Sequence, residues 1–335
     1  MIACARPMSS WIQKVRDVAR RNRPSRKPQL WEDPWLSLRR RLAFEVNRRT
    51  RADWLDSTHV IPLSGAGFAN GGGAPLSLAV VPREMMNQSL FLYGSFEIAE
   101  TRLIQSLLRP GMTFLDIGAN IGYYTVIGAR LVGPSGKVHC FEPHPEIRAR
   151  LQDNIARNGF QNVVVHGEAV AENSGTVSFF VSAYDENQGV SSILPGSGRR
   201  ESQPVPSVSL DDFVAGLGPG GVDLIKMDIE GAEVQVISGG QRTLSANDAP
   251  AIIFEAANLE PVARALSAFG YRIKRHHYTL ARGLELLDPD AAFDNIFGEY
   301  EAPNYLAAKD AAVFQAAVDA ANAARPAMLR VLGRI

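Results

Sequence analysis

Cysteine is scarce in this sequence, which limits the classes of protein that it can encode. Two cysteines occur among 335 residues, Cys4 near the N-terminus and Cys140 in an apolar run. A disulfide framework is therefore not expected, and the chain fits a reducing, cytoplasmic compartment. No cluster of cysteine and histidine has the spacing of a zinc site, and the adjacent His276 and His277 would point to opposite faces of a strand.

Long apolar runs are also missing. No stretch of about 18 apolar residues occurs, so we expect no transmembrane helix. The first residues lack the apolar segment of a signal peptide and soon become basic. With 46% hydrophobic and 21% charged residues, the composition is typical of a soluble globular protein, and the length suffices for one large domain with extensions.

The formal net charge is zero, but the charges are unevenly distributed. Residues 1–51 contain 14 lysines and arginines against four acidic residues, a balance of +10, so the remainder carries −10. Such a segment can bind nucleic acid, anionic lipid or an acidic partner, although a solvated helical extension is the simpler interpretation. Within it, residues 35–49 predict an amphipathic helix able to rest on a membrane surface or to cover a partner.

Strands and helices are predicted to alternate from residue 113 onward. Repeated units of this kind form a parallel, doubly wound α/β sheet with helices on both faces. We expect a basic, partly helical extension at 1–85, a main domain at 86–310 and a C-terminal helix within 311–335. The strands are predicted at 113–117, 137–142, 162–167, 222–229, 251–256, 271–276 and 304–309.

Three other segments have distinct patterns. The glycine-rich residues 65–75 indicate a flexible connection, because no Lys-Ser or Lys-Thr pair follows them as in a phosphate-binding loop. The polar residues 185–206 predict an irregular connection at the rim of the site, either a substrate loop or a disordered insertion. Ser209 is placed to cap the N-terminus of the short helix that begins after it.

The segment TFLDIGANIGYYT, which starts at Thr113, contains the first candidate ligand site. Asp116 ends the predicted strand, and Gly118, Asn120 and Gly122 follow it. Glycines at this place let a ligand approach the backbone closely, although a structural turn would also use them. A pyrophosphate prefers bare amides at a helix N-terminus, so the acid of Asp116 favours a cation or an amine instead.

The ends of two further strands limit which ligands can bind. Glu142 ends the second strand, where a carboxylate can accept hydrogen bonds from both hydroxyls of a ribose and would repel a phosphorylated one. Glu168 and Ala169 follow the third strand, where an adenine ring can lie. An adenosine with a free ribose and a cationic tail is the ligand that these positions favour, and S-adenosylmethionine has this structure.

Several motifs in this order resemble the FkbM-type family of S-adenosylmethionine-dependent methyltransferases. They are LYGSFE (92–97), PGMTFLDIGANIGYYT (110–125), KVHCFEPHP (137–145), SLDD (209–212) and DLIKMDIEGAE (223–233), and the resemblance covers about residues 90–310. It implies a class I methyltransferase fold, which is Rossmann-like, with a mostly parallel seven-stranded sheet and an antiparallel last strand. It also implies O-methylation of a hydroxyl on a natural product, sugar or glycan.

By this resemblance Asp116, Gly118, Asn120, Glu142 and the Glu168-Ala169 turn bind the cofactor, and Gly122 gives it room. The KMDIEG motif would place Lys226, Asp228 and Glu230 beside the transferred methyl group. Glu255, at the end of the next strand, is expected to face the same cleft. We expect the catalytic carboxylates to be Asp228, Glu230 and Glu255.

Other roles for these carboxylates stay open. Asp228 could organise the cofactor loop, Glu230 could cap a helix, and Glu255 could form a salt bridge. His144 and His166 are further candidates for a base. Carboxylates in one cleft could also hold Mg²⁺ or Ca²⁺, but our prediction is that no metal is bound.

Two other functions compete with the methylation of small molecules. The basic N-terminal segment would suit RNA ribose methylation, although the sequence contains neither an Asn/Asp-Pro-Pro-Tyr segment after the fourth strand nor a Pro-Cys nucleophile for other nucleic-acid methylation. A non-catalytic module that binds the cofactor is the second alternative. The expected partner is a small-molecule or carbohydrate acceptor, with a homo-oligomer as an open alternative.

Overall fold

The computed structural model describes residues 34–51, 53–63, 75–184, 189, 191–196, 198–218, 220–279, 283–291 and 303–323. Most of the basic N-terminal segment and nearly all of the glycine-rich stretch 65–75 lie outside these residues. In the described part, no helix is long and apolar enough to cross a membrane.

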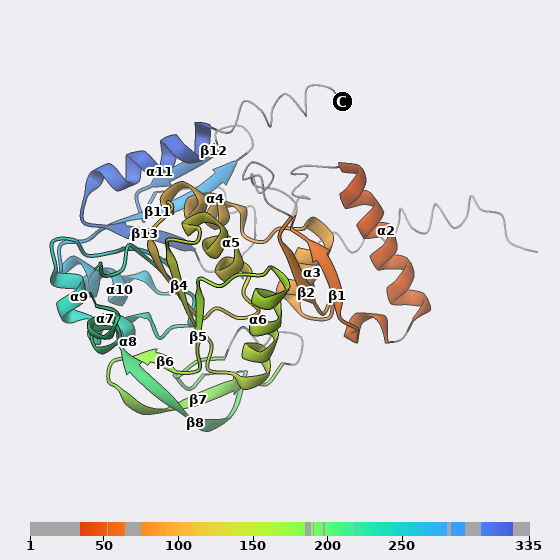
Figure 1. Cartoon of the computed structure of the whole chain (residues 1–335), viewed down its shortest axis with the longest axis horizontal. Coiled ribbons are helices and arrows are strands. Elements are labelled where there is room, and N and C mark those ends of the chain that lie inside the picture. Colours follow the sequence, from red (N-terminus) through yellow and green to blue (C-terminus); the bar gives the residue numbers. More distant parts are fainter. Residues whose placement is uncertain are drawn as a thin grey trace, which may run out of the picture.

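The largest unit of the structure is an eight-stranded sheet (Figure 1). Five neighbouring strands run parallel, as the alternating pattern predicts, and β13 runs antiparallel between β10 and β11. This confirms the doubly wound, mostly parallel sheet expected of a class I methyltransferase, with β12 added at one edge as an eighth strand. Across the sheet the order is β12 (Gly283–Leu287), β11 (Arg272–Thr279), β13 (Asn304–Ala308), β10 (Ala251–Glu255), β9 (Leu224–Met227), β3 (Thr113–Ile117), β4 (Lys137–Phe141) and β5 (Val163–His166).

The extra strand β12 results from a hairpin that the sequence does not predict. The apolar pattern predicts that the preceding strand ends at residue 276, but β11 continues to Thr279 and pairs back with β12. Leu284 and Leu286 of β12 pack into the same apolar core as α11 (Ala311–Ala323). The hairpin is therefore stabilised by a long-range contact, which a local pattern cannot reveal.

Helices cover both faces of the large sheet (Figure 1). Local sequence explains where they begin and end: the Ser209 hydroxyl accepts a hydrogen bond from the backbone N–H of Asp212 (3.1 Å), which confirms the predicted cap. Gly159 adopts a φ of 69° just after α6, as expected of a helix stop. One face carries α4 (Ile98–Leu107), α5 (Tyr123–Val132), α6 (Pro145–Arg157) and α11, and the other carries α7 (Leu210–Leu217), α8 (Glu233–Ser238), α9 (Gln241–Ser245) and α10 (Leu259–Ser267).

A second, three-stranded sheet corrects the predicted connection at 185–206. It consists of β6 (Ala169–Ala171), β8 (Arg199–Ser209) and β7 (Gly175–Ser182), so the second half of this connection is a strand. The prolines explain the wrong prediction: Pro204 and Pro206 pair only with β7, on a part of β8 that has no neighbour on its other side. Proline is tolerated at such an edge because no hydrogen bond to a second neighbour is lost.

The residues before the sheet contribute to its core. Leu78 and Val80 of β2 (Ser77–Val80), which pairs with β1 (His59–Pro62), pack in the same core cluster as α4 and α5. Asn154 of α6 accepts a hydrogen bond from the backbone N–H of Ala79 (2.7 Å) and donates one to Ile121 O (2.9 Å). The N-terminal part is thus fastened to α6, and the domain boundary at residue 85 stays a prediction.

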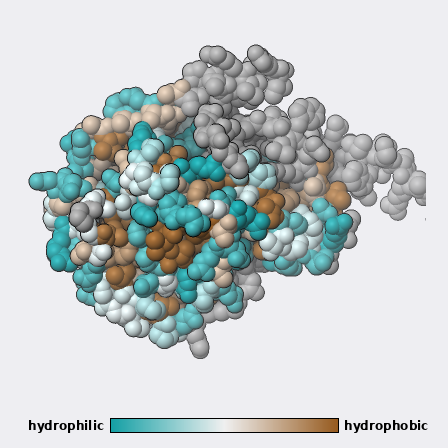
Figure 2. Space-filling model, viewed as in Figure 1, coloured by the Kyte–Doolittle hydropathy of each residue, from teal (hydrophilic) through white to brown (hydrophobic). Residues whose placement is uncertain are grey.

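The predicted amphipathic helix at 35–49 is confirmed as α2 (Pro34–Thr50), which extends away from the large sheet (Figure 1). Phe44 of α2 contacts Trp54 edge to face, with ring centroids 5.6 Å apart. Leu42 and Val46, one turn apart, are 46% and 45% exposed. Elsewhere on the face shown in Figure 2, apolar residues gather in a central area bordered by hydrophilic ones.

Candidate functional site

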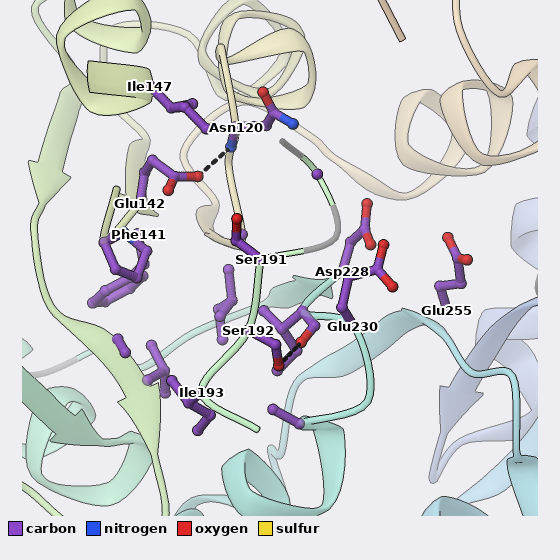
Figure 3. A pocket seen from close by; sticks show the side chains of 18 of the residues that line it. Asn120, Phe141, Glu142, Ile147, Ser191, Ser192, Ile193, Asp228, Glu230 and Glu255 are labelled. Atoms are coloured by element: carbon purple, nitrogen blue, oxygen red, sulfur yellow. Dashed lines mark hydrogen bonds between the residues drawn. The ribbon is translucent and has the colours of Figure 1, made fainter. Parts of the chain in front are cut away.

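A pocket of about 250 Å³ opens at the carboxyl ends of β3, β4, β9 and β10. Its two sides differ in chemistry (Figure 3): Phe141 and Ile147 lie near Glu142 on one side, and Asp228, Glu230 and Glu255 lie on the other. Ligands of doubly wound sheets bind at this edge. The remaining lining residues are Met85, Met86, Ser89, Phe96, Glu97, Ile117, Gly118, Asn120, Pro143, Glu168, Ala169, Val170, Phe179, Gly189, Ser191, Ser192, Ile193, Ile229 and Ala232.

Glu142 lies on the apolar side and is held there by backbone hydrogen bonds. Its two carboxylate oxygens accept hydrogen bonds from the backbone N–H groups of Asn120 (3.0 Å) and His144 (2.9 Å). Burial raises the pKa of Glu142 to about 7, although these two hydrogen bonds oppose the rise. Asn120 is held in a left-handed backbone conformation (φ 50°), which brings its N–H to this carboxylate.

Aromatic and aliphatic side chains form the rest of the apolar side. The His166 ring stacks on Phe141, with centroids 4.6 Å apart, and Phe213 of α7 packs on both. Glu168 and Ala169, which sequence reasoning predicted beside an adenine, do line the pocket here. A flat, apolar ring fits this side better than a phosphate does, because no lysine or arginine belongs to the described lining.

The two predicted glycines are needed by the protein's own packing. A Cβ at Gly118 would lie 2.1 Å from the carbonyl oxygen of Asp228, and a Cβ at Gly122 would lie 2.5 Å from Cδ1 of Leu151. Both glycines also have φ values of 80° and 92°. Gly118 lines the pocket, but the room that its missing side chain leaves is occupied by the chain after β9 rather than by a ligand.

Asp116, which the sequence predicts to bind the cofactor, is buried next to the pocket. Its side chain is fully buried and lies outside the pocket lining. Oδ2 accepts a hydrogen bond from the Thr125 hydroxyl (2.6 Å), while Oδ1 has no hydrogen-bond partner. Burial raises the pKa of Asp116, and the charge of Lys226 opposes that rise. Asp116 is therefore a buried carboxyl close to Lys226, and its contact with the cofactor's amine stays a prediction.

Lys226 and Asp228 form the centre of the acidic side. The Lys226 ammonium lies 3.2 Å from Oδ2 of Asp228 and 4.8 Å from the centroid of the Tyr124 ring. Lys226 is only 3% exposed, and its acidic neighbours, Asp228 first, raise its pKa against the effect of burial. β9 ends at Met227, so the predicted strand to residue 229 is too long, yet Lys226 and Asp228 still meet.

Glu230 and Glu255 stand on either side of Asp228. Glu230 has a left-handed backbone (φ 56°) and lies exposed at the rim, and its pKa is raised by desolvation and by the Asp228 charge. Desolvation, followed by the charge of Asp228, raises the pKa of Glu255 to about 10. The structure thus brings the three predicted carboxylates to one wall of the pocket.

The sequence indicated Glu97 only as a residue that could fold over the cofactor as a lid or cap a surface helix, and not as a carboxylate of the acidic side. It precedes α4, lines the pocket and accepts a hydrogen bond from the Tyr124 hydroxyl (2.9 Å). Its neighbours Met85, Met86 and Phe96 line the pocket as well. The LYGSFE motif (92–97) was the only sequence feature that pointed to this segment. The hydrophobic pattern does not show that the residues before α4 reach the carboxyl ends of the strands.

The other candidates are accounted for separately. Within the described residues, no group of three or more histidine, cysteine, aspartate or glutamate side chains is arranged to hold a metal ion. His144 and His166 are partly buried, and burial lowers the pKa of each. Ser191, Ser192 and Ile193, from the predicted polar connection, line the pocket between its two sides (Figure 3).

The strand order and the pocket at the carboxyl ends are those of the class I methyltransferase fold. Residues 116–273 match the family model of the methyltransferase FkbM domain. Residues 116–273 therefore form an FkbM-type methyltransferase domain, as the motifs predicted.

Relatives and solved structures extend this comparison. The chain is 31% identical to 2-O-methyltransferase NoeI of Sinorhizobium fredii, with 43% of this chain and 64% of that protein covered. It is 27% identical to 31-O-demethyl-FK506 methyltransferase FkbM of Streptomyces tacrolimicus, covering 52% and 75%. A crystal structure of methyltransferase FkbM from Methylobacillus flagellatus KT superposes with a TM-score of 0.39 at 18% identity, over 65% of this chain and 52% of that one. The chain spans slightly less than two thirds of NoeI.

Proposed function

We propose that this protein is an S-adenosylmethionine-dependent O-methyltransferase that acts on a hydroxyl of a natural product, sugar or glycan. The observation that carries the proposal is the two-sided pocket, with an apolar side next to Glu142 and an acidic side around Asp228. An adenosine matches the first side and a cationic sulfonium and amine match the second. The names of the two O-methyltransferase relatives support the reaction class.

The residues present fit the cofactor. Glu142 keeps lone pairs for ribose hydroxyls while its own orientation is fixed by Asn120 and His144. Gly118 and Asn120 bring backbone to the same edge, and Glu168 and Ala169 border the ring site. Bound S-adenosylmethionine would supply an activated methyl group with a good leaving group.

The acidic side is proposed to hold the acceptor. Asp228, Glu230 and Glu255 line this side and can form hydrogen bonds with the hydroxyls of an acceptor. Alignment of the hydroxyl with the methyl group accounts for several kcal/mol of the barrier reduction in reactions of this kind. Four acids lie on this side, with Glu97 counted, so a neutral or cationic acceptor is favoured over an anionic one.

Calorimetry with S-adenosylhomocysteine tests the cofactor site, and a labelled-methyl assay on glycan and polyketide pools tests the transfer. We expect micromolar binding and label in at least one neutral, hydroxyl-bearing pool. A full-length protein that does not bind S-adenosylhomocysteine would contradict the enzyme function.

The basic balance of residues 1–51 keeps RNA ribose methylation as the second candidate. A salt-sensitive gel shift of structured RNA with the full-length chain, lost in a chain lacking residues 1–33, would favour it. The cytoplasmic location and a homo-oligomeric state are predictions that accompany either candidate.

A further inference from the structure

Glu97 is held in a strained conformation at the edge of the pocket. In the described part of the chain, three residues other than glycine have a left-handed backbone, namely Glu97 (φ 37°), Asn120 and Glu230, and all three line this pocket. Such a conformation costs of order 1–3 kcal/mol and persists where the surrounding structure enforces it, often at functional sites. Among the described acids of the lining, Glu97 alone lies outside residues 116–273.

The Glu97 carboxyl is also fixed in position. The Tyr124 hydroxyl donates a hydrogen bond to it, and the Tyr124 ring in turn lies against the ammonium of Lys226. Lys226 pairs with Asp228 on the acidic side. The start of α4, together with α5 and β9, therefore holds this carboxyl in the lining of the pocket, whereas the carboxylate of Asp228 is engaged by Lys226.

We propose that Glu97 accepts the proton of the acceptor hydroxyl during methyl transfer, an assignment that rests on the proposed function above. In this step the oxygen–hydrogen bond breaks and its proton passes to the Glu97 carboxylate. The oxygen forms a bond to the methyl carbon, and the carbon–sulfur bond breaks with its electron pair left on sulfur. The positive charge lost from the sulfonium reappears as the proton on Glu97, so the net charge within the pocket is unchanged.

The charges around Glu97 suit this exchange. Desolvation and the Asp228 charge raise the pKa of Glu97 to about 7, while Lys226 and the Tyr124 hydroxyl lower it. The sulfonium in the pocket favours the ionised form of Glu97. When methyl transfer removes the positive charge from sulfur, the protonated form of Glu97 is favoured. The titratable groups that face Glu97 are Glu100 of α4, Tyr123 and Tyr124 of α5, Lys226 and Asp228 at the end of β9, and Glu255 of β10.

Proton release on binding tests the assignment without a known acceptor. Calorimetry of the full-length protein at pH 7, in buffers of different ionisation enthalpy, compares S-adenosylmethionine with S-adenosylhomocysteine. Because only the first carries a sulfonium, we expect it to release roughly 0.3–0.5 proton more. Glu97→Gln should lose most of this difference while binding S-adenosylhomocysteine within about threefold of the native protein, and Glu146→Gln, an exposed change on α6, should retain it.

A second variant covers the case in which Glu97→Gln does not fold. Tyr124→Phe removes the hydroxyl that lowers the Glu97 pKa, so the midpoint of the extra proton release should move to higher pH by roughly 0.5–1 unit. A release that neither variant changes overturns the assignment of Glu97 alone. Absence of S-adenosylhomocysteine binding by the native protein overturns the proposed function together with it.

Once an acceptor is found, the Glu97→Gln variant can also be tested kinetically. The transfer rate of Glu97→Gln should fall by roughly 10²-fold or more and lose the rise that the native rate shows up to about pH 7. An unchanged pH profile would count against Glu97.

Discussion

Glu142 and Asp228 show how single carboxyl groups divide the work of the pocket. Glu142 is 6% exposed and keeps two backbone hydrogen bonds, whereas Asp228 pairs with the almost fully buried Lys226. Glu142 is held by backbone N–H groups in the turns that follow β3 and β4, and Asp228 is held by the ammonium of Lys226. Predictions at this scale therefore separate binding from transfer.

Affinity for S-adenosylhomocysteine should rise with pH through the pKa of Glu142. The ribose hydroxyls donate hydrogen bonds to the ionised form of Glu142. Because its pKa is about 7, the carboxyl is protonated at lower pH and must lose that proton before the ribose can bind. We expect binding about tenfold weaker at pH 6 than at pH 8, measured by calorimetry. Glu142→Gln should bind weakly at both pH values, and a retained pH slope in that variant would contradict the role of Glu142.

Asp228→Asn should reduce methyl transfer by roughly 10²-fold while leaving affinity for S-adenosylhomocysteine within a few-fold. The amide keeps the shape of the side chain but loses the charge that pairs with Lys226. Steady-state rates and calorimetry on the same preparation separate the two effects. Full activity of this variant on the true acceptor would exclude Asp228 from the reaction.

Gly118→Ala should destabilise the fold strongly. Its Cβ would meet the Asp228 carbonyl oxygen at 2.1 Å, and its φ of 80° disfavours a side chain. We expect a loss of about 2–5 kcal/mol in the free energy of unfolding, measured with denaturant. Gly159→Ala is the matched control, since its φ is 69° but no atom lies within 4 Å of its Cβ, and it should cost only about 1–2 kcal/mol.

At the scale of elements, local patterns predicted the buried strands well and the paired edges poorly. The strand at 113–117 is correct because a parallel strand buried on both faces is a continuous apolar run. β8 and β12 have no such run: prolines interrupt the first, and the second depends on packing against α11. The candidate carboxylates at strand ends could be predicted from the same logic. The place of Glu97 among them could not, since it depends on how α3 (Met85–Tyr93) and α4 pack.

The link between β2 and α6 is the element contact most open to a test. Asn154 is fully buried and hydrogen-bonds to backbone groups of Ala79 and Ile121. Asn154→Ala would leave these buried groups without partners, so we expect a loss of about 2–4 kcal/mol in the free energy of unfolding. Asp153→Ala, exposed on the same helix, should change it by no more than about 0.5 kcal/mol, and equal effects would contradict the proposed link.

For the whole molecule, the buried acids make stability depend on pH. The pKa values of Glu97 and Glu142 are raised to about 7, so the folded state retains protons that the unfolded chain releases near pH 4–5. Their stabilising contribution is complete below the unfolded pKa and is lost as the pH rises through the folded pKa.

We therefore expect these two groups to lower the free energy of unfolding of the ligand-free protein by about 5 kcal/mol between pH 5 and pH 8. Urea titrations at several pH values measure this change. The double variant Glu97→Gln, Glu142→Gln should show a shallower curve, with the remaining slope due to Glu230 and Glu255, whose pKa values are also raised. A native stability that rises over this range would contradict the burial of these acids.

The pocket is built from two separate lengths of chain. The matched domain supplies Glu142, Asp228 and Glu255, while the α3–α4 segment before it supplies Met85, Met86 and Glu97. Both lengths border the acidic side, so a substitution in either one can reshape the same cavity. Changes in the α3–α4 segment can therefore alter which molecules fit the pocket while residues 116–273 keep their sequence.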